Sequence, residues 1–160
     1  MRFLKLIVIS VLIYSCNNIK NSDNYEGQNY DELSTEIIKY LDNEYSVNPI
    51  RDKKKVALVY VPVSACTPCV DVAIDFLMKN KLNNLYGVLT SRFKKDFVNF
   101  SNIIPNENLF VDNQGNYLDY KFNLGSPLII LFNNEKITGI HKIDEQNIDE
   151  IKTISINHIK

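Results

Sequence analysis

The chain has 160 residues, enough for one domain with additional segments. Apolar residues make up 45% of it and charged residues 23%, which is the ordinary composition of a globular protein. The formal net charge of -1 argues against a nucleic-acid-binding protein, because such a protein carries a clear basic excess.

The first residues have the pattern of an export signal. Arg2 and Lys5 form a short positive region, and an almost uninterrupted apolar run extends from Leu6 to Tyr14. A membrane span needs about 20 residues, so this run is too short to cross a bilayer, but it suits the core of a signal peptide. The chain is therefore expected to be exported.

The apolar run leads into one of the three cysteines of the chain. The residues Leu12-Ile13-Tyr14-Ser15-Cys16 resemble the lipobox of bacterial lipoproteins, in which a small residue precedes a cysteine that is lipidated and becomes the new N-terminus. The resemblance implies a lipoprotein signal peptide over residues 1–15. It also implies a protein of the bacterial cell envelope, lipid-anchored at Cys16 and facing an extracytoplasmic compartment. An ordinary signal peptide followed by an unrelated cysteine is the alternative. Residues 16–30 are rich in asparagine and predict a flexible tether.

Residues 31–160 are expected to form one domain that begins with a helix. Apolar side chains recur at helical spacing from Asp31 to Tyr45, and Asp31 is a suitable N-cap. Asn48-Pro49 ends that helix, because the residue before a proline disfavours the helical conformation. The basic residues between Arg51 and Lys55 are interpreted as a solvated lead-in to the next strand. Contact with an acidic partner or with lipid headgroups is the alternative.

The next segment combines a buried strand with an amphipathic helix. The apolar run from Val56 to Val63 predicts the strand, and apolar residues at helical spacing from Val70 to Leu77 predict the helix. Cys66 and Cys69 therefore lie where a strand turns into a helix. A helix N-terminus presents unpaired N–H groups and the positive end of the helix dipole, which stabilise a thiolate and lower the pKa of the first cysteine.

Two more strands are expected in the middle of the chain. The first covers Leu85 to Thr90, and Ser91 then caps a helix with a phenylalanine stripe between Phe93 and Phe100. Such a stripe is more typical of a core than of a ligand site. The second strand covers Asn108 to Asp112 and is closed by the turn Asn113-Gln114-Gly115-Asn116.

The last third of the chain predicts a hairpin between two short helical segments. A helical turn is expected within Tyr117 to Asn123, and the strands Leu128 to Phe132 and Lys136 to His141 form a β-hairpin that turns at Asn133-Asn134. A final helix follows Asp144, its expected N-cap. This order of elements indicates an α/β fold with a mixed central sheet flanked by helices. The middle of the sheet is expected to be parallel, with the hairpin adding antiparallel strands.

The sequence Cys66-Thr67-Pro68-Cys69 is compatible with three kinds of chemistry: a redox dithiol, half of a metal site, or a static disulfide. A structural zinc site needs four ligands, and the two histidines, His141 and His158, are far apart in the sequence. A static disulfide across two residues gains little from loop closure. The position between a strand and a helix favours the redox dithiol.

The cysteine pair and a later proline together resemble the thioredoxin superfamily. Cys66-Thr67-Pro68-Cys69 follows a buried strand, and Gly125-Ser126-Pro127 opens another. The chain is more closely similar to the membrane-anchored thiol–disulfide oxidoreductases of the TlpA type. In that group, a layout like that of Asp112-Asn113-Gln114-Gly115 and Tyr120-Lys121-Phe122-Asn123-Leu124 precedes the proline. The similarity covers about Lys55 to Ile154. It implies a thioredoxin-like fold and exchange of disulfides with protein cysteines.

The resemblance also implies a role for each residue around the pair. Cys66 would be the exposed nucleophile and Cys69 the more buried resolving thiol. Thr67 would tune the redox potential of the pair, and Pro68 would restrict the backbone at the start of the helix. Pro127 would be a cis-proline beside the dithiol, and Ser126 would offer its backbone to an extended substrate peptide. No cofactor is then expected, because the redox-active group is the disulfide between Cys66 and Cys69. The expected partners are protein thiols or disulfides, with a membrane electron donor for recycling and no nucleic acid.

Two departures from the family pattern lead to other hypotheses. Ala65 stands where many relatives have tryptophan, and Tyr60 stands where they have an acidic or amide residue that assists proton transfer. A catalytically weak binding module with the same fold is therefore one alternative. A copper-binding assembly factor that uses Cys66, Cys69 and His141 is another, because thiolates with one imidazole suit copper.

Overall fold

The computed structural model describes residues 29–100, 108–122 and 124–160. The expected signal peptide, Cys16 and nearly all of the expected tether lie outside these residues. The helices are α2 (Tyr30–Glu44), α3 (Pro49–Asp52), α4 (Thr67–Lys79) and α5 (Ile148–Ile159), with the 3₁₀ helices η2 (Lys94–Phe100) and η3 (Asn116–Asp119). The strands are β1 (Lys55–Pro62), β2 (Leu85–Thr90), β3 (Leu109–Asp112), β4 (Leu128–Asn133) and β5 (Lys136–Lys142). No helix within the described ranges combines the length and the apolar character that crossing a membrane requires.

The strands form one mixed sheet in the order β3-β2-β1-β4-β5. β1 and β2 pair in parallel, as do β2 and β3. The hairpin strands β4 and β5 pair antiparallel with each other, and β4 pairs antiparallel with β1. The predicted mixed α/β architecture is confirmed, with three parallel strands and an antiparallel hairpin.

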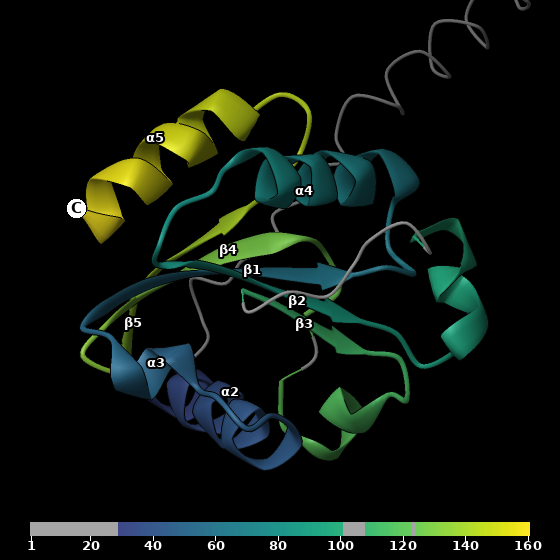
Figure 1. Cartoon of the computed structure of the whole chain (residues 1–160), viewed down its shortest axis with the longest axis horizontal. Helices are drawn as coiled ribbons and strands as arrows, with labels where there is room; N and C mark the ends of the chain where they lie inside the picture. The colour runs from purple at the N-terminus through teal and green to yellow at the C-terminus, as the bar shows by residue number, and fades with distance from the viewer. Residues whose placement is uncertain (1–28, 101–107, 123) are drawn as a thin grey trace, which may run out of the picture.

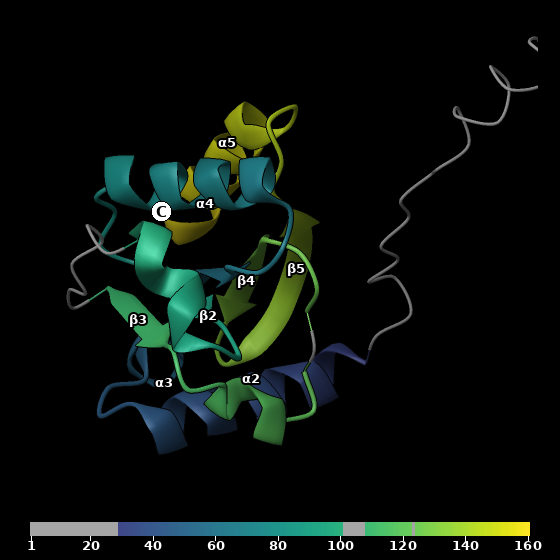
Figure 2. The same cartoon turned by 90° about the vertical axis from the view of Figure 1, so that its right-hand side faces the viewer.

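Helices cover both faces of the sheet (Figures 1 and 2). α4 and α5 lie on one face, and α2, α3 and η3 lie on the other. Successive side chains of β1 pack on opposite faces of the sheet. Leu58 lies in the hydrophobic cluster beneath α2, whereas Val59 lies in the hydrophobic cluster beneath α4 and α5. Because helices cover both faces of the sheet, every residue of β1 from Val56 to Pro62 is buried. This explains why the sequence of β1 is an uninterrupted apolar run.

The N-cap predictions for α2 and α5 are wrong by two and by three residues, respectively. α2 is capped by Asn29, whose side-chain oxygen accepts hydrogen bonds from the N–H groups of Asp31 and Glu32 at 3.1 and 3.3 Å. Asp144 accepts from the N–H of Asn147 at 3.0 Å, but this bond closes a turn that precedes α5. In both places several short polar side chains compete for adjacent N–H groups, and the sequence pattern does not show which one lies at the helix boundary.

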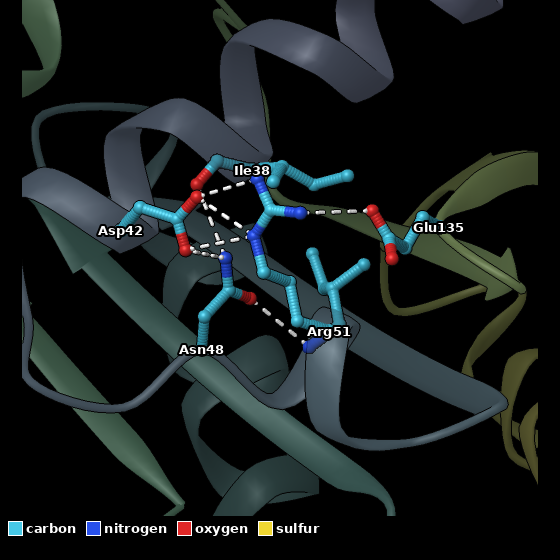
Figure 3. Close-up of polar contacts among 6 residues, drawn as sticks. Ile38, Asp42, Asn48, Arg51 and Glu135 are labelled. Atoms are coloured by element: carbon cyan, nitrogen blue, oxygen red, sulfur yellow. Dashed lines mark hydrogen bonds and ion pairs between the residues drawn. The ribbon is translucent and has the colours of Figure 1, made fainter.

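Asn48-Pro49 begins the short helix α3, whereas the sequence analysis predicted only that the preceding helix ends there. Asn48 caps α3 by accepting from the N–H of Ile50 at 3.0 Å, and Pro49 needs no N–H partner in the first turn. Figure 3 shows that the Asn48 amide also donates to the carbonyl of Ile38 and to Asp42, at 3.1 and 2.8 Å. Arg51 pairs with Asp42 at 2.8 Å, so the first residue of the basic run ties α3 to α2 and is not merely solvated.

We expect Asn48→Ala to lower the free energy of unfolding by about 1–3 kcal/mol, because a helix cap is lost and the buried carbonyl of Ile38 loses its donor. Urea unfolding of the full chain measures the change. Glu135→Gln is the matched control, since the exposed pair between Glu135 and Arg51 is worth at most about 0.5–1 kcal/mol. Equal unfolding midpoints for Asn48→Ala and the unmodified chain would contradict the capping role.

The phenylalanine segment forms a 3₁₀ helix rather than the expected α-helix. Ser91 accepts a hydrogen bond from the N–H of Phe93 at 3.1 Å, but the helix begins at Lys94, so Ser91 lies before the helix and is not the N-cap that was predicted. Phe97 and Phe100 pack against the cluster beneath α4 and α5, but Phe93 remains 52% exposed. A 3₁₀ helix repeats every three residues, so Phe97 and Phe100 share a face and Phe93 does not. The prediction of a core stripe is correct for two of the three rings.

The hairpin turn lies one residue later than predicted. Asn133 is the last residue of β4 and pairs with Lys136. Asn134 and Glu135 occupy the two central positions with φ values of 49° and 65°. Two consecutive left-handed residues form the turn type whose twist matches that of a hairpin, and asparagine tolerates this conformation well.

Candidate functional site

The cysteine pair lies at the start of α4. The chain leaves β1 in a tight turn, closed by the N–H of Ala65 donating to the carbonyl of Pro62 at 2.9 Å. Cys66 occupies the N-cap position, and its carbonyl accepts the first helical hydrogen bond from Val70 at 3.0 Å. Pro68 lies in the first turn, where a missing N–H leaves no bond unmade. The pair therefore lies where the strand gives way to the helix, as the sequence pattern predicted.

The two thiols differ in exposure and are in contact. Cys66 is exposed and Cys69 is partly buried, and both are free cysteines. The Cys69 thiol donates to the Cys66 sulfur, with an Sγ–Sγ distance of 2.9 Å. Thr67 and Pro68 between them are exposed. Cys66 can therefore meet an external sulfur atom while Cys69 stays behind it within reach.

The contact separates the acidities of the two thiols. The hydrogen bond from the Cys69 thiol, and then the one from the Cys69 backbone N–H, hold the pKa of Cys66 below its ordinary value. The same thiol–thiol hydrogen bond, together with burial, raises the pKa of Cys69. Cys66 is thus the thiol that ionises first, and Cys69 keeps its proton until the Cys66 sulfur loses its negative charge.

Two charged residues, one at the end of β5 and one shortly after it, shift the pKa of Cys66. Lys142 lowers the pKa of Cys66 and Glu145 raises it. These residues reach the site through the sheet: Tyr60 of β1 pairs with Leu128 of β4, and Leu128 pairs with Lys142 of β5. The segments that follow β1 and β5 and the segment that precedes β4 therefore emerge at the same edge. The sequence analysis missed Lys142 and Glu145, because only the strand order brings them there.

Ser126 and Pro127 precede β4 at this edge. Pro127 is buried, and its carbonyl accepts from the N–H of Ile143 at 2.9 Å. The described parts of the chain contain no cis peptide bond, so the Ser126–Pro127 bond is trans and the expectation of a cis-proline is wrong for this structure. Trans is the ordinary preference of an X–Pro bond, by about 0.5–1 kcal/mol.

Tyr60 lies away from the cysteine pair. It belongs to the cluster beneath α2, on the face of the sheet opposite α4, and its hydroxyl accepts from the Thr90 side chain at 3.0 Å. Its ring packs edge-on against Phe122. Tyr60 is therefore a core residue on the face of the sheet opposite α4. Ala65 packs beside the cluster beneath α4.

The turn after β3 is held by a buried carboxylate that the sequence analysis had treated only as part of a turn. Asp112 is 5% exposed and bonds with residues on both sides of the turn. Its oxygens accept from the backbone N–H groups of Gln114, Gly115, Asn116 and Tyr117 and from the hydroxyl of Tyr40. Burial raises the pKa of Tyr40, which keeps this hydroxyl a donor. The signal in the sequence is Asp112 followed by Gly115, which adopts a left-handed φ of 81°.

The proposed copper ligands are not gathered into a site. In residues 29–100, 108–122 and 124–160, no three His, Cys, Asp or Glu side chains are grouped so that they could hold a metal ion. His141 lies in β5, opposite Ile129 of β4. The hypothesis that Cys66, Cys69 and His141 bind copper therefore has no support from their arrangement.

The pH dependence of Cys66 alkylation should report the electrostatics of the pair. Only the thiolate reacts, so the rate should rise with pH and reach half its plateau below 9.0, the ordinary pKa of a cysteine thiol. Lys142→Gln should move this midpoint to higher pH, because a stabilising positive charge is lost. Glu145→Gln should move it to lower pH. Iodoacetamide kinetics of the Cys16→Ser full chain measure all three midpoints, and shifts of the same sign in both variants would contradict the assignment.

No protein-family model, no curated protein and no solved structure matches this chain. The function of the site is therefore argued from its own residues and geometry.

Proposed function

We propose that the chain is a thiol–disulfide oxidoreductase with a thioredoxin-like fold that exchanges disulfides with protein cysteines. The observation that carries this proposal is the contact between Cys66 and Cys69, an exposed thiol of lowered pKa bonded at 2.9 Å to a partly buried thiol of raised pKa. This asymmetry suits a nucleophile and a resolving thiol. The mixed sheet, with helices on both faces and the pair at the start of α4, is compatible with the fold.

The exchange proceeds in two balanced steps. The Cys66 thiolate attacks one sulfur of the client disulfide, so that a mixed disulfide forms and the other client sulfur leaves as a thiolate that takes up a proton. Cys69 then loses its proton and attacks the Cys66 sulfur, which releases the second client thiolate. The protein is left with a Cys66–Cys69 disulfide, and the two electrons of its dithiol have passed to the client. The reverse sequence oxidises a client dithiol.

The proposed setting is the bacterial cell envelope. The leader before Cys16 supports export and lipid anchoring, and residues 16–30 would tether the domain to the membrane surface. Protein thiols and disulfides are the proposed clients, and a membrane electron donor would return the pair to its dithiol form. No bound cofactor is needed for this chemistry, because the redox group is the cysteine pair itself.

A catalytically weak binding module remains the second candidate. The observation in its favour is Tyr60, a tyrosine that packs in the core on the face of the sheet opposite α4, where the resemblance implies an acidic or amide residue that assists proton transfer. Such a protein would form the mixed disulfide and release it slowly. A single rapid turnover followed by a slow steady state would identify it.

Turnover of a model protein disulfide tests the proposal. The full chain carrying Cys16→Ser is mixed with insulin and dithiothreitol, and reduction of insulin is followed over time. We expect a rate clearly above that of dithiothreitol alone. The chain that carries Cys66→Ser as well as Cys16→Ser should reduce insulin only at the rate of dithiothreitol alone. Equal rates for the two proteins would remove the claim of catalysis.

A further inference from the structure

A groove runs from the cysteine pair between the two helices of one layer. α4 and α5 lie side by side on the same face of the sheet (Figures 1 and 2). The groove between them has a volume of about 660 Å³ and begins at Pro68, the residue directly before Cys69. Val72, Phe76 and Ile148 supply its apolar lining. One end of this open groove therefore lies beside the cysteine motif, since Pro68 lines it, and its volume is large enough for several side chains.

The charge of the groove is uneven along its length. Both helices start at the edge of the sheet where the cysteines lie, because α4 follows β1 and α5 follows β5. Near the starts of α4 and α5, three carboxylates line the groove: Asp71, Glu145 and Asp149. The lysines Lys79 and Lys152 lie farther along.

The carboxylates at this end of the groove have no close ion-pair partner within the described part of the chain, although the positive charge of Lys142 also acts on the cysteine pair. Among the described residues, Asp71, Glu145 and Asp149 have no ion pair within 4.0 Å, whereas the more distant Asp75 pairs with Lys79 at 2.8 Å. The end of the groove next to Cys66 is therefore negative and lined in part by apolar atoms. Lysine and arginine side chains combine an apolar stem with a cationic head, so they match both properties.

We propose that this groove binds a basic segment of the client protein that flanks the client's reactive cysteine. The inference rests on the proposed disulfide exchange at Cys66, and it names the class of client. The stems of lysine or arginine side chains would pack on Val72 and Ile148, and their cationic heads would lie near Asp71 and Asp149. Pro68 lines the groove and lies between Cys66 and Cys69 in the sequence, so a segment bound there passes close to the cysteine motif.

A cationic segment would also act on the nucleophile. The negative charge of Glu145 opposes ionisation of Cys66. A client lysine or arginine close to Glu145 offsets that charge and so favours the Cys66 thiolate at the moment of docking. Binding and activation would then be coupled for basic clients and not for acidic ones.

Peptide disulfides of opposite charge test the proposal. Two peptides share one disulfide and an apolar core and differ only in flanking lysine or glutamate residues. The rate of mixed-disulfide formation at Cys66 is measured for each with the Cys16→Ser full chain, and is expressed relative to the rate with the neutral disulfide of 2-mercaptoethanol. We expect the basic peptide to react on the order of tenfold faster than the acidic one at low salt, with the preference shrinking as salt is added.

Variants locate the effect in the groove. Asp71→Asn combined with Asp149→Asn should bring the ratio of the basic to the acidic rate close to one. Glu150→Gln is the matched control, because Glu150 is an exposed acid in the same turn of α5 that does not line the groove, and its ratio should remain that of the unmodified chain. Equal rates for the two peptides in the unmodified chain would overturn the proposal that the groove binds basic segments. A preference for the basic peptide that survives the double substitution would overturn it as well. Failure of the neutral disulfide to react with Cys66 would overturn the proposed exchange itself, whichever peptide is used.

Discussion

Replacing Cys69 with serine should convert a transient mixed disulfide into a stable one. In the exchange argued above, Cys66 bonds to the client and Cys69 displaces it, so a protein without Cys69 can complete only the first step. The Cys16→Ser, Cys69→Ser full chain, mixed with an oxidised client, should accumulate a covalent complex up to the amount of the limiting partner. Non-reducing electrophoresis and intact mass measure it.

The reciprocal variant supplies the control for this trapping experiment. Cys66→Ser leaves only Cys69, which is less exposed than Cys66, and it should form little or no complex under the same conditions. Trapping through Cys69 with equal efficiency would reverse the assigned roles. Absence of any complex from the Cys69→Ser chain would show that Cys66 does not act as a nucleophile toward protein disulfides.

Removing the carboxylate of Asp112 should have the largest effect on stability. Asp112→Ala leaves four backbone N–H groups and the Tyr40 hydroxyl without the carboxylate that accepts from them, and the bonds from Gly115, Tyr117 and Tyr40 are buried. We expect a loss of about 3–5 kcal/mol in the free energy of unfolding, from the cost of unpaired buried donors. Urea unfolding of the full chain measures it, with Tyr40→Phe as the comparison, since that variant loses only the two bonds of the Tyr40 hydroxyl, to Asp112 and to Tyr45, at about 1 kcal/mol each.

Two outcomes would contradict this view of Asp112. A loss no greater than that of Tyr40→Phe would mean that the turn does not depend on the carboxylate. An unchanged stability together with lost disulfide exchange would instead assign Asp112 to the chemistry of the site. Exposed Gln114 offers a check within the same turn, because Gln114→Ala keeps the backbone N–H that Asp112 accepts and should unfold like the unmodified chain.

The sheet could be predicted because its strands are buried on both faces. β1 and β2 are continuous apolar runs, and such runs between polar segments indicate buried strands without further information. The helix boundaries were less well predicted. Asn29, rather than Asp31, caps α2, and Asn48 begins a helix rather than ending one, since neighbouring polar side chains offer nearly equal local bonds and tertiary contacts decide among them.

The site could be predicted only as far as it is local in sequence. The position of Cys66 and Cys69 at a strand–helix junction follows from neighbouring residues. The charges that act on them do not, because Lys142 and Glu145 are more than seventy residues away and arrive through the pairing of β1 with β4 and of β4 with β5. Tyr60 shows the same limit: the sequence marked it only as a departure from the family pattern, and the alternation of β1 places its side chain in the core on the face opposite α4.

A redox titration of the cysteine pair tests the central claim most directly. The Cys16→Ser full chain is equilibrated in buffers of graded dithiol and disulfide composition, and free thiols are counted by alkylation and intact mass. The account predicts a single reversible two-electron transition in which Cys66 and Cys69 lose their alkylation together as one intramolecular disulfide forms. Two thiols that remain alkylatable in the most oxidising buffer, or that oxidise only by linking separate chains, would contradict it.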